Sequence, residues 1–168
     1  MNLSGAACVP TTPKFTSCLI ANDEKKYAQF FSIEGNVLVP RKLIRLSDDD
    51  KAPDAEGVAY EKGFFYVTGS HGRSRKSDKE NRSSYAVFRI AVDPQTGVPK
   101  TEPNAKKVDG VEASSRMREV IENDKYVKAK FNKPLADGGV NVEGIAVRNG
   151  RMYFGLRGPS LERQAYVL

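Results

Sequence analysis

The sequence predicts an all-β fold: a partial β-propeller of about three antiparallel blades, with one short inserted helix near residues 114–123. Two features indicate this fold. A strand-turn-strand segment that begins Gly-x-Ala occurs three times, and each copy continues into a third apolar run that contains alanine. Three or four short strands per repeat are typical of a propeller blade.

The repeat is clearest in its second and third copies, residues 56–69 and 143–155. Matching positions lie 87 residues apart, as for Tyr66 and Tyr153 (153 − 66). The first copy, 4–23, has a longer turn and a serine in place of the glutamate. A constant offset across strand, turn and strand indicates that the copies are structurally equivalent.

Each copy has the composition of an antiparallel hairpin. β-branched and aromatic residues fill the runs, and Lys62-Gly63 and Asn149-Gly150 provide turns that tolerate positive φ. The repeat glycines, Gly5, Gly57 and Gly144, are expected to allow close backbone approach near the propeller axis.

The chain is expected to form a single domain over 1–168. The predicted blades span about 3–46, 55–92 and 140–168, the last of them incomplete, and the second is followed by an insertion over 93–139. Residues 41–46 fit a fourth strand for the first blade, whereas no fourth strand is evident for the second.

The insertion begins with a turn over 93–97 and contains the predicted helix. Helical spacing places Met117, Val120 and Ile121 on one face, and Ser114 is a candidate N-cap. That apolar face is expected to pack against the core.

Three blades are too few to close a propeller. The chain also stops on an apolar strand, 165–168, without a polar tail. The sequence is therefore expected to be the N-terminal half of a longer propeller, in which missing blades or a second copy complete the ring.

Composition narrows the choice of partners. The chain has 27 Lys and Arg against 21 Asp and Glu, for a net charge of +6, which mildly favours an anionic partner such as an anionic small molecule; the alternative is an ordinary basic surface without a partner. The basic cluster at 73–82 lacks interleaved aromatic residues, which disfavours nucleic acid. No apolar run reaches the length of a membrane span, and a cytoplasmic location is expected if Met1 is the native start.

Cys8 and Cys18 are the only cysteines. If the two runs that contain them pair as a hairpin, the thiols lie close enough for a disulfide. The alternative is two separate buried thiols.

The chain resembles an uncharacterised bacterial propeller-like family, a domain of unknown function numbered 3616, and more distantly the esterase-like phytase propellers. The resemblance rests on segments 3–9, 18–24, 54–59, 69–71, 138–146 and 155–159, of which Gly-Ser-His and Gly-Leu-Arg-Gly-Pro are the most specific. It implies a longer full-length protein and no established activity, because a propeller fold does not fix a function.

Carboxylates at equivalent repeat positions suggest a metal site. Glu56 and Glu143 would face one end of the central channel, and Asp23 and Glu24 follow the second strand of the first copy. Oxygen ligands of this kind suit Ca²⁺ or Mg²⁺. The alternative is that the glutamates hydrogen-bond a neighbouring blade and lock the blades together.

His71 is the only histidine, and it lies in a loop rich in Gly and Ser. It is a candidate acid or base, and Ser70, Arg73 and Arg157 are candidate groups that bind an anionic substrate. Arg157 occupies the position of Ser70 in the next blade (157 − 70). A Ser-His-Asp hydrolase is disfavoured because Ser70 and His71 are adjacent and point to opposite sides.

Three functional hypotheses follow. The first is a metal-assisted hydrolase of phosphate or ester substrates. The second is a non-catalytic propeller that binds a protein or carbohydrate partner. The third is an inactive fragment of a larger protein whose site is completed elsewhere.

Overall fold

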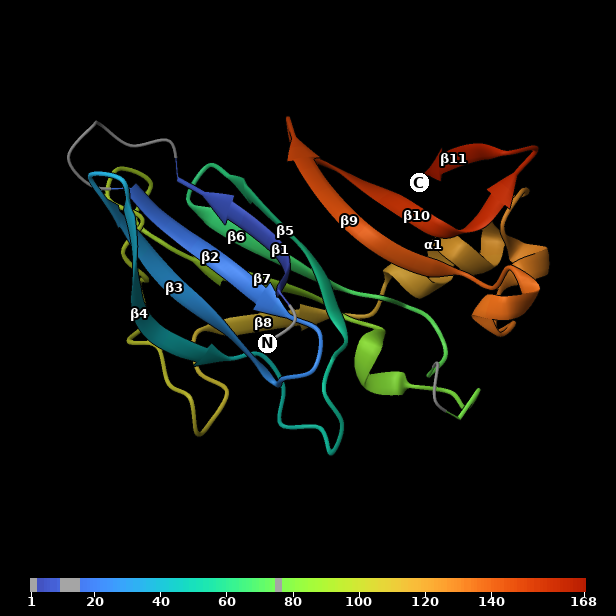
Figure 1. Ribbon diagram of the computed structural model, residues 1–168, viewed down its shortest axis with the longest axis horizontal. Coiled ribbons are helices and arrows are strands. Elements are labelled where there is room, and N and C mark those ends of the chain that lie inside the picture. Colours follow the sequence, from blue (N-terminus) through green and yellow to red (C-terminus); the bar gives the residue numbers. More distant parts are fainter. Residues whose placement is uncertain (1–2, 10–15, 75–76) are drawn as a thin grey trace.

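The computed structural model describes residues 3–9, 16–74 and 77–168, which form three antiparallel sheets (Figure 1). Sheet 1 consists of β1 (Leu3–Cys8), β2 (Thr16–Asn22), β3 (Tyr27–Glu34) and β4 (Val37–Arg45). Sheet 2 consists of β5 (Ala55–Glu61), β6 (Phe64–Gly69), β7 (Val87–Ala91) and β8 (Val111–Ser114). Sheet 3 consists of β9 (Asn141–Arg148), β10 (Arg151–Leu161) and β11 (Gln164–Val167).

In every sheet, neighbouring strands follow one another along the chain, as in a propeller blade. The predicted all-β, propeller-like fold is confirmed, and the described sheets form a stack that is not closed into a ring. One α-helix, α1 (Met117–Asn123), and three short 3₁₀ helices occur in the described residues: η1 (Arg82–Ser84), η2 (Lys128–Lys130) and η3 (Leu135–Asp137).

Three local predictions need correction. Sheet 2 has a fourth strand, which the sequence did not predict. This strand, β8, lies within the predicted insertion and pairs with β7. Ser114 is the last residue of β8 and not a helix cap, since the N-cap position of α1 is Arg116 and no side chain caps it. Val120 is 53% exposed, whereas Met117 and Ile121 are buried as predicted.

The repeat glycines bring the first strands of the sheets together. A Cβ atom on Gly5 would lie 2.7 Å from the Cα of Gly57, and one on Gly57 would lie 2.8 Å from the backbone nitrogen of Ile145 and 3.0 Å from the Cα of Gly144. Because Cβ atoms do not occur this close to backbone, only glycine allows β1, β5 and β9 to stack. The predicted close approach is confirmed.

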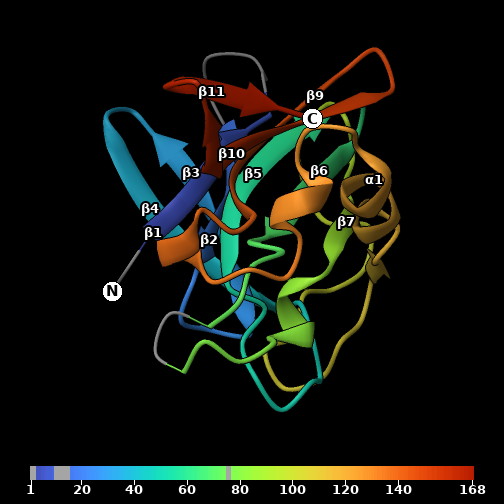
Figure 2. The ribbon, with the colours of Figure 1, turned by 90° about the vertical axis from the view of Figure 1, so that its right-hand side faces the viewer.

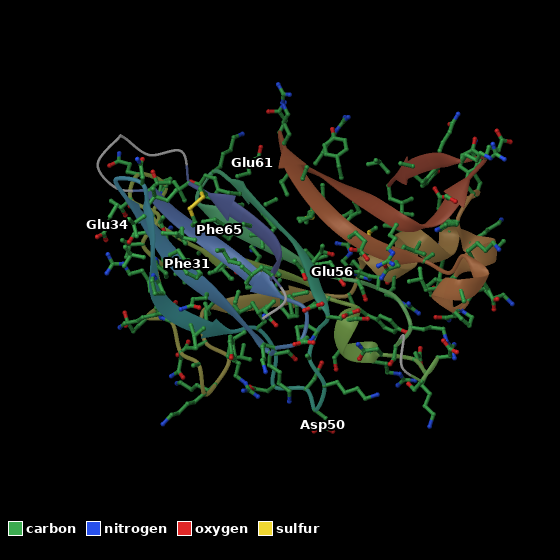
Figure 3. The ribbon with its side chains drawn as sticks, in the orientation of Figure 1. Phe31, Glu34, Asp50, Glu56, Glu61 and Phe65 are labelled. Carbon is green, nitrogen blue, oxygen red and sulfur yellow. A yellow bond between two sulfur atoms is a disulfide. The ribbon has the colours of Figure 1, made fainter. Side chains whose placement is uncertain are left out.

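Apolar side chains fill the space between consecutive sheets. Phe65 is fully buried between sheets 1 and 2, where its ring centroid lies 6.0 Å from that of Phe30 and 5.2 Å from that of Tyr60 (Figure 3). A second cluster lies between sheets 2 and 3 and includes the buried residues of α1. The blades are therefore held together by two separate apolar layers.

The cysteine pair forms a disulfide. Cys8 and Cys18 lie directly opposite each other in the β1–β2 ladder and are joined by an S–S bond. Of the two alternatives that the sequence left open, the structure shows the hairpin disulfide.

Glu61, at the far end of β5 from Glu56, links sheets 2 and 3 (Figure 3). Its carboxylate accepts hydrogen bonds from the backbone N–H groups of Asn149 at 2.5 Å and Gly150 at 3.1 Å, in the β9–β10 turn. This is the kind of blade lock that the sequence assigned, as one alternative, to Glu56 and Glu143.

Candidate functional site

A pocket of about 370 Å³ lies where strands of all three sheets begin or end. We call it the strand-end pocket; its lining residues are Asp23, Glu24, Lys51, Asp54, Gly72, Arg73, Ser74, Asn81, Leu135, Val140 and Asn141. Two larger pockets, of about 760 and 630 Å³, lie elsewhere, and neither is lined by a residue that the sequence analysis proposed as catalytic, substrate-binding or metal-binding. The strand-end pocket, in contrast, collects Asp23, Glu24 and Arg73.

Antiparallel pairing explains why these residues meet. Asp23 follows the end of β2, Asp54 precedes the start of β5, and Asn141 is the first residue of β9. Since β1, β5 and β9 stack through their glycines, the loops at this end of the sheets lie beside one another. A backbone hydrogen bond of 2.7 Å from Val142 N–H to the Ser70 carbonyl joins sheets 2 and 3 next to the pocket.

The pocket wall contains acceptor oxygens without hydrogen-bond partners. Among the described residues, Asp23 Oδ1, Asn81 Oδ1 and Asn141 Oδ1 are buried atoms that make no hydrogen bond. Asn141 as a whole is 6% exposed. Buried polar atoms are almost always paired in folded proteins, and an ordered water or a bound group that donates to these three acceptors would pair them.

His71 does not line the strand-end pocket. Its side chain is 2% exposed and stacks on Tyr85, with 6.5 Å between ring centroids. Neither ring nitrogen has a hydrogen-bond partner in the described structure. Burial, and secondarily the charge of Arg118, lowers the pKa of His71 to about 3, so the imidazole is neutral near pH 7.

Arg118 closes the space around His71. Its guanidinium lies 3.6 Å from the Tyr85 ring centroid and 4.1 Å from that of Phe131, and it donates to Asn132 Oδ1 at 3.0 Å. These cation–π contacts fix Arg118 over the rings. His71 is therefore enclosed by protein, which does not suit the acid or base role that the sequence assigned to it.

Ser70 and Arg73 both hold the loop after β6. Ser70 is fully buried, and its Oγ accepts a hydrogen bond from the Gly72 N–H at 3.3 Å. Arg73 donates to the backbone carbonyls of Asp78 at 2.5 Å and Asn132 at 3.1 Å. Arg73 lines the pocket, but these bonds direct its guanidinium towards backbone carbonyl groups.

Three further candidate site residues from the sequence, Glu56, Glu143 and Arg157, do not line the pocket. Glu56 is buried at 6% exposure, and Glu143 accepts a hydrogen bond from Arg157 Nη1 at 3.2 Å. Arg157 and Glu143 thus form an ion pair within the β9–β10 hairpin, although the sequence assigned them to substrate and metal respectively. In the described ranges, no three His, Cys, Asp or Glu side chains gather as metal ligands.

Sequence reasoning missed Asn81, Asn141 and Asp54, although the repeat contained a signal for two of them. Asp54 and Asn141 are 87 residues apart (141 − 54), and each lies three positions before its repeat glycine. The first copy has Asn2 at that position, outside the described residues. In the two copies whose residue at this place is described, Asp54 and Asn141, it lines the strand-end pocket.

Comparison with known families supports the resemblance to the domain of unknown function numbered 3616, and not the more distant one to phytase propellers. A family model described as a protein of unknown function, DUF3616, matches residues 17–92 and 87–168. No curated protein and no solved structure matches the chain. The two matched segments cover most of the chain, which therefore belongs to the DUF3616 family of proteins of unknown function.

Proposed function

We propose that the chain is a binding domain whose strand-end pocket takes a small molecule rich in hydroxyl groups, such as a polyol or a monosaccharide. The observation that carries this proposal is the set of unpaired oxygen acceptors on Asp23, Asn81 and Asn141 around the pocket. A buried acceptor without a partner costs about 1 to 3 kcal/mol, and a ligand hydroxyl that donates to it removes that cost.

Size and charge favour such a ligand over an anion. The pocket volume of about 370 Å³ falls within the range of small-molecule sites, about 300 to 1,000 Å³, and far exceeds a single ion. Three carboxylates, of Asp23, Glu24 and Asp54, line it against two cations, Lys51 and Arg73. The lining is thus net acidic, which favours a neutral or cationic donor over the anionic partner expected from the overall composition.

The second candidate is the metal-assisted hydrolase suggested by the sequence. It is favoured by the chemistry of the unpaired atoms, since carboxylate and amide oxygens are ligands that Ca²⁺ and Mg²⁺ accept. Amide oxygens of Asn81 and Asn141 would have to supplement Asp23, because the carboxylates that line the pocket do not come together as a set of three metal ligands in the described residues. An ion held there would polarise a phosphate or ester group.

Calorimetric titration separates the two candidates. Wild-type protein is titrated with a panel of monosaccharides and polyols, and in parallel with CaCl₂ and MgCl₂. We expect binding of a hydroxylated compound that Asn141→Leu weakens about tenfold, because one lost hydrogen bond corresponds to about 1.4 kcal/mol. Asn123→Leu, at an exposed position on α1, is the matched control and should bind like wild type.

Two results would contradict the binding proposal. One is the absence of heat with every hydroxylated compound; the other is binding that Asn141→Leu leaves unchanged. Binding of Ca²⁺ or Mg²⁺ alone, lost in Asp23→Asn, would instead support the hydrolase candidate and justify assays with phosphate and ester substrates.

A further inference from the structure

Sheet 3 ends the stack with an unpartnered face. Cβ atoms built on Gly144 and Gly155, which pair in the β9–β10 ladder, would meet no atom of the described residues within 4 Å. Ala146 pairs with Tyr153, which is 42% exposed, and Val167, opposite Gly155, is 58% exposed. We call these five residues the open face of sheet 3; Figure 2 views the molecule from the β9–β11 side.

The repeat shows what covers the equivalent face of sheet 2. The residues that correspond to Gly144, Ala146, Tyr153 and Gly155 by the offset of 87 are Gly57, Ala59, Tyr66 and Thr68. Gly57 contacts the β9 backbone, Ala59 is 7% exposed and Thr68 is fully buried. In sheet 2 this face is therefore covered by the next blade, sheet 3.

Sheet 1 ends the stack at the opposite side with the complementary face. Ala6 is exposed and pairs with Ile20, which lines a groove of about 300 Å³ together with Phe31. In sheet 3, Ile145 and Phe154 are paired in the same way, and both belong to the apolar cluster between sheets 2 and 3. The outer face of sheet 1 thus corresponds to the face of sheet 3 that packs against sheet 2.

We propose that the open face of sheet 3 binds sheet 1 of a second copy of this chain, with Gly144 packed against the incoming β1. The contact is head-to-tail, like those between sheets 1 and 2 and between sheets 2 and 3, and it leaves the same pair of faces available on the opposite side. Two copies then close a ring of six blades, within the usual range for propellers.

Gly144→Glu tests the contact without disturbing the single chain, because the new side chain points into open space. By analytical ultracentrifugation, wild type is expected to sediment with twice the 18.5 kDa mass of one chain. Gly144→Glu should be monomeric and should keep the wild-type circular dichroism spectrum. Val98→Glu, at a position 54% exposed in the turn after β7, is the matched control and should remain dimeric.

Mixing two variants tests the head-to-tail arrangement. Ala6→Arg alone should also be monomeric, but an equimolar mixture with Gly144→Glu should form dimers, because one of the two contacts is then free of both substitutions. A monomeric wild type up to about 100 μM, a concentration well above the Kd of stable assemblies, would overturn the proposal. Dimers that persist in Gly144→Glu, or a mixture that stays monomeric, would overturn it as well.

Discussion

Replacing Gly57 with alanine is expected to lower the free energy of unfolding by about 3 kcal/mol. The new methyl group would lie 2.8 Å from the backbone nitrogen of Ile145 and 3.0 Å from the Cα of Gly144, and neither can move without shifting β9. Separating β5 from β9 would also loosen the apolar layer between sheets 2 and 3. Chemical denaturation followed by circular dichroism measures the change.

Gly144→Ala is the matched control, because it introduces the same methyl group at the equivalent repeat position, where nothing lies within 4 Å. Measured at concentrations at which the chain is monomeric, it should change the free energy of unfolding by no more than about 0.5 kcal/mol. Equal effects of the two substitutions would contradict the glycine-mediated stacking of β5 on β9.

Acidification is expected to destabilise the fold through His71. Its pKa is about 3 in the folded protein, because of burial and the nearby Arg118, against the ordinary value of 6.5 in the unfolded chain. Between these values the unfolded chain binds a proton that the folded protein does not. The stabilisation is therefore complete above pH 6.5 and falls by about 1.4 kcal/mol for each pH unit below it, until about pH 3.

Urea denaturation at pH 7.5 and 4.5 measures this effect, with His71→Asn as the comparison. Asparagine tolerates the positive φ of 52° at this position and does not titrate. Since the chain has one histidine, the wild type should lose about 3 kcal/mol more than the variant over this range, from the two pH units below 6.5. Equal losses in both proteins would show that His71 titrates as in the unfolded chain.

The repeat predicted the stacked sheets because a constant residue offset between copies indicates equivalent positions in the fold. Positions that share the offset of 87, such as Tyr66 and Tyr153, occupy equivalent places in sheets 2 and 3. Hairpin pairing made a Cys8–Cys18 disulfide possible, but the sequence alone did not decide between it and two separate thiols. β8 was missed because the irregular segment 92–110 separates it from β7, so no repeat signal marked it.

The candidate site was harder to predict, because tertiary contacts that the sequence does not reveal determine which side chains are paired, buried or accessible. The repeat position of Glu143 suggested a metal ligand and that of Arg157 a substrate-binding group, yet the two side chains pair with each other within one hairpin. His71 looked accessible in a Gly- and Ser-rich loop, but stacking on Tyr85 and the cover of Arg118 bury it. Asn141 shares the repeat offset with Asp54, but nothing in that position indicates a site residue until its buried Oδ1 atom is seen to make no hydrogen bond.

The disulfide bears on the expected location. Disulfides persist mainly in oxidising compartments, so the Cys8–Cys18 bond does not favour the cytoplasm, and the cytoplasmic location stays a prediction. Among the described helices, none is both long enough and apolar enough to cross a membrane.

An amide-resolved NMR titration with the tightest hydroxylated compound from the calorimetric panel shows whether the strand-end pocket is a ligand site. We expect the largest chemical-shift changes on pocket residues such as Gly72, Asn81 and Asn141, and no change at Gly35 and Gly97. Changes confined to residues outside the pocket lining, or no saturable change at all, would contradict the proposed ligand site.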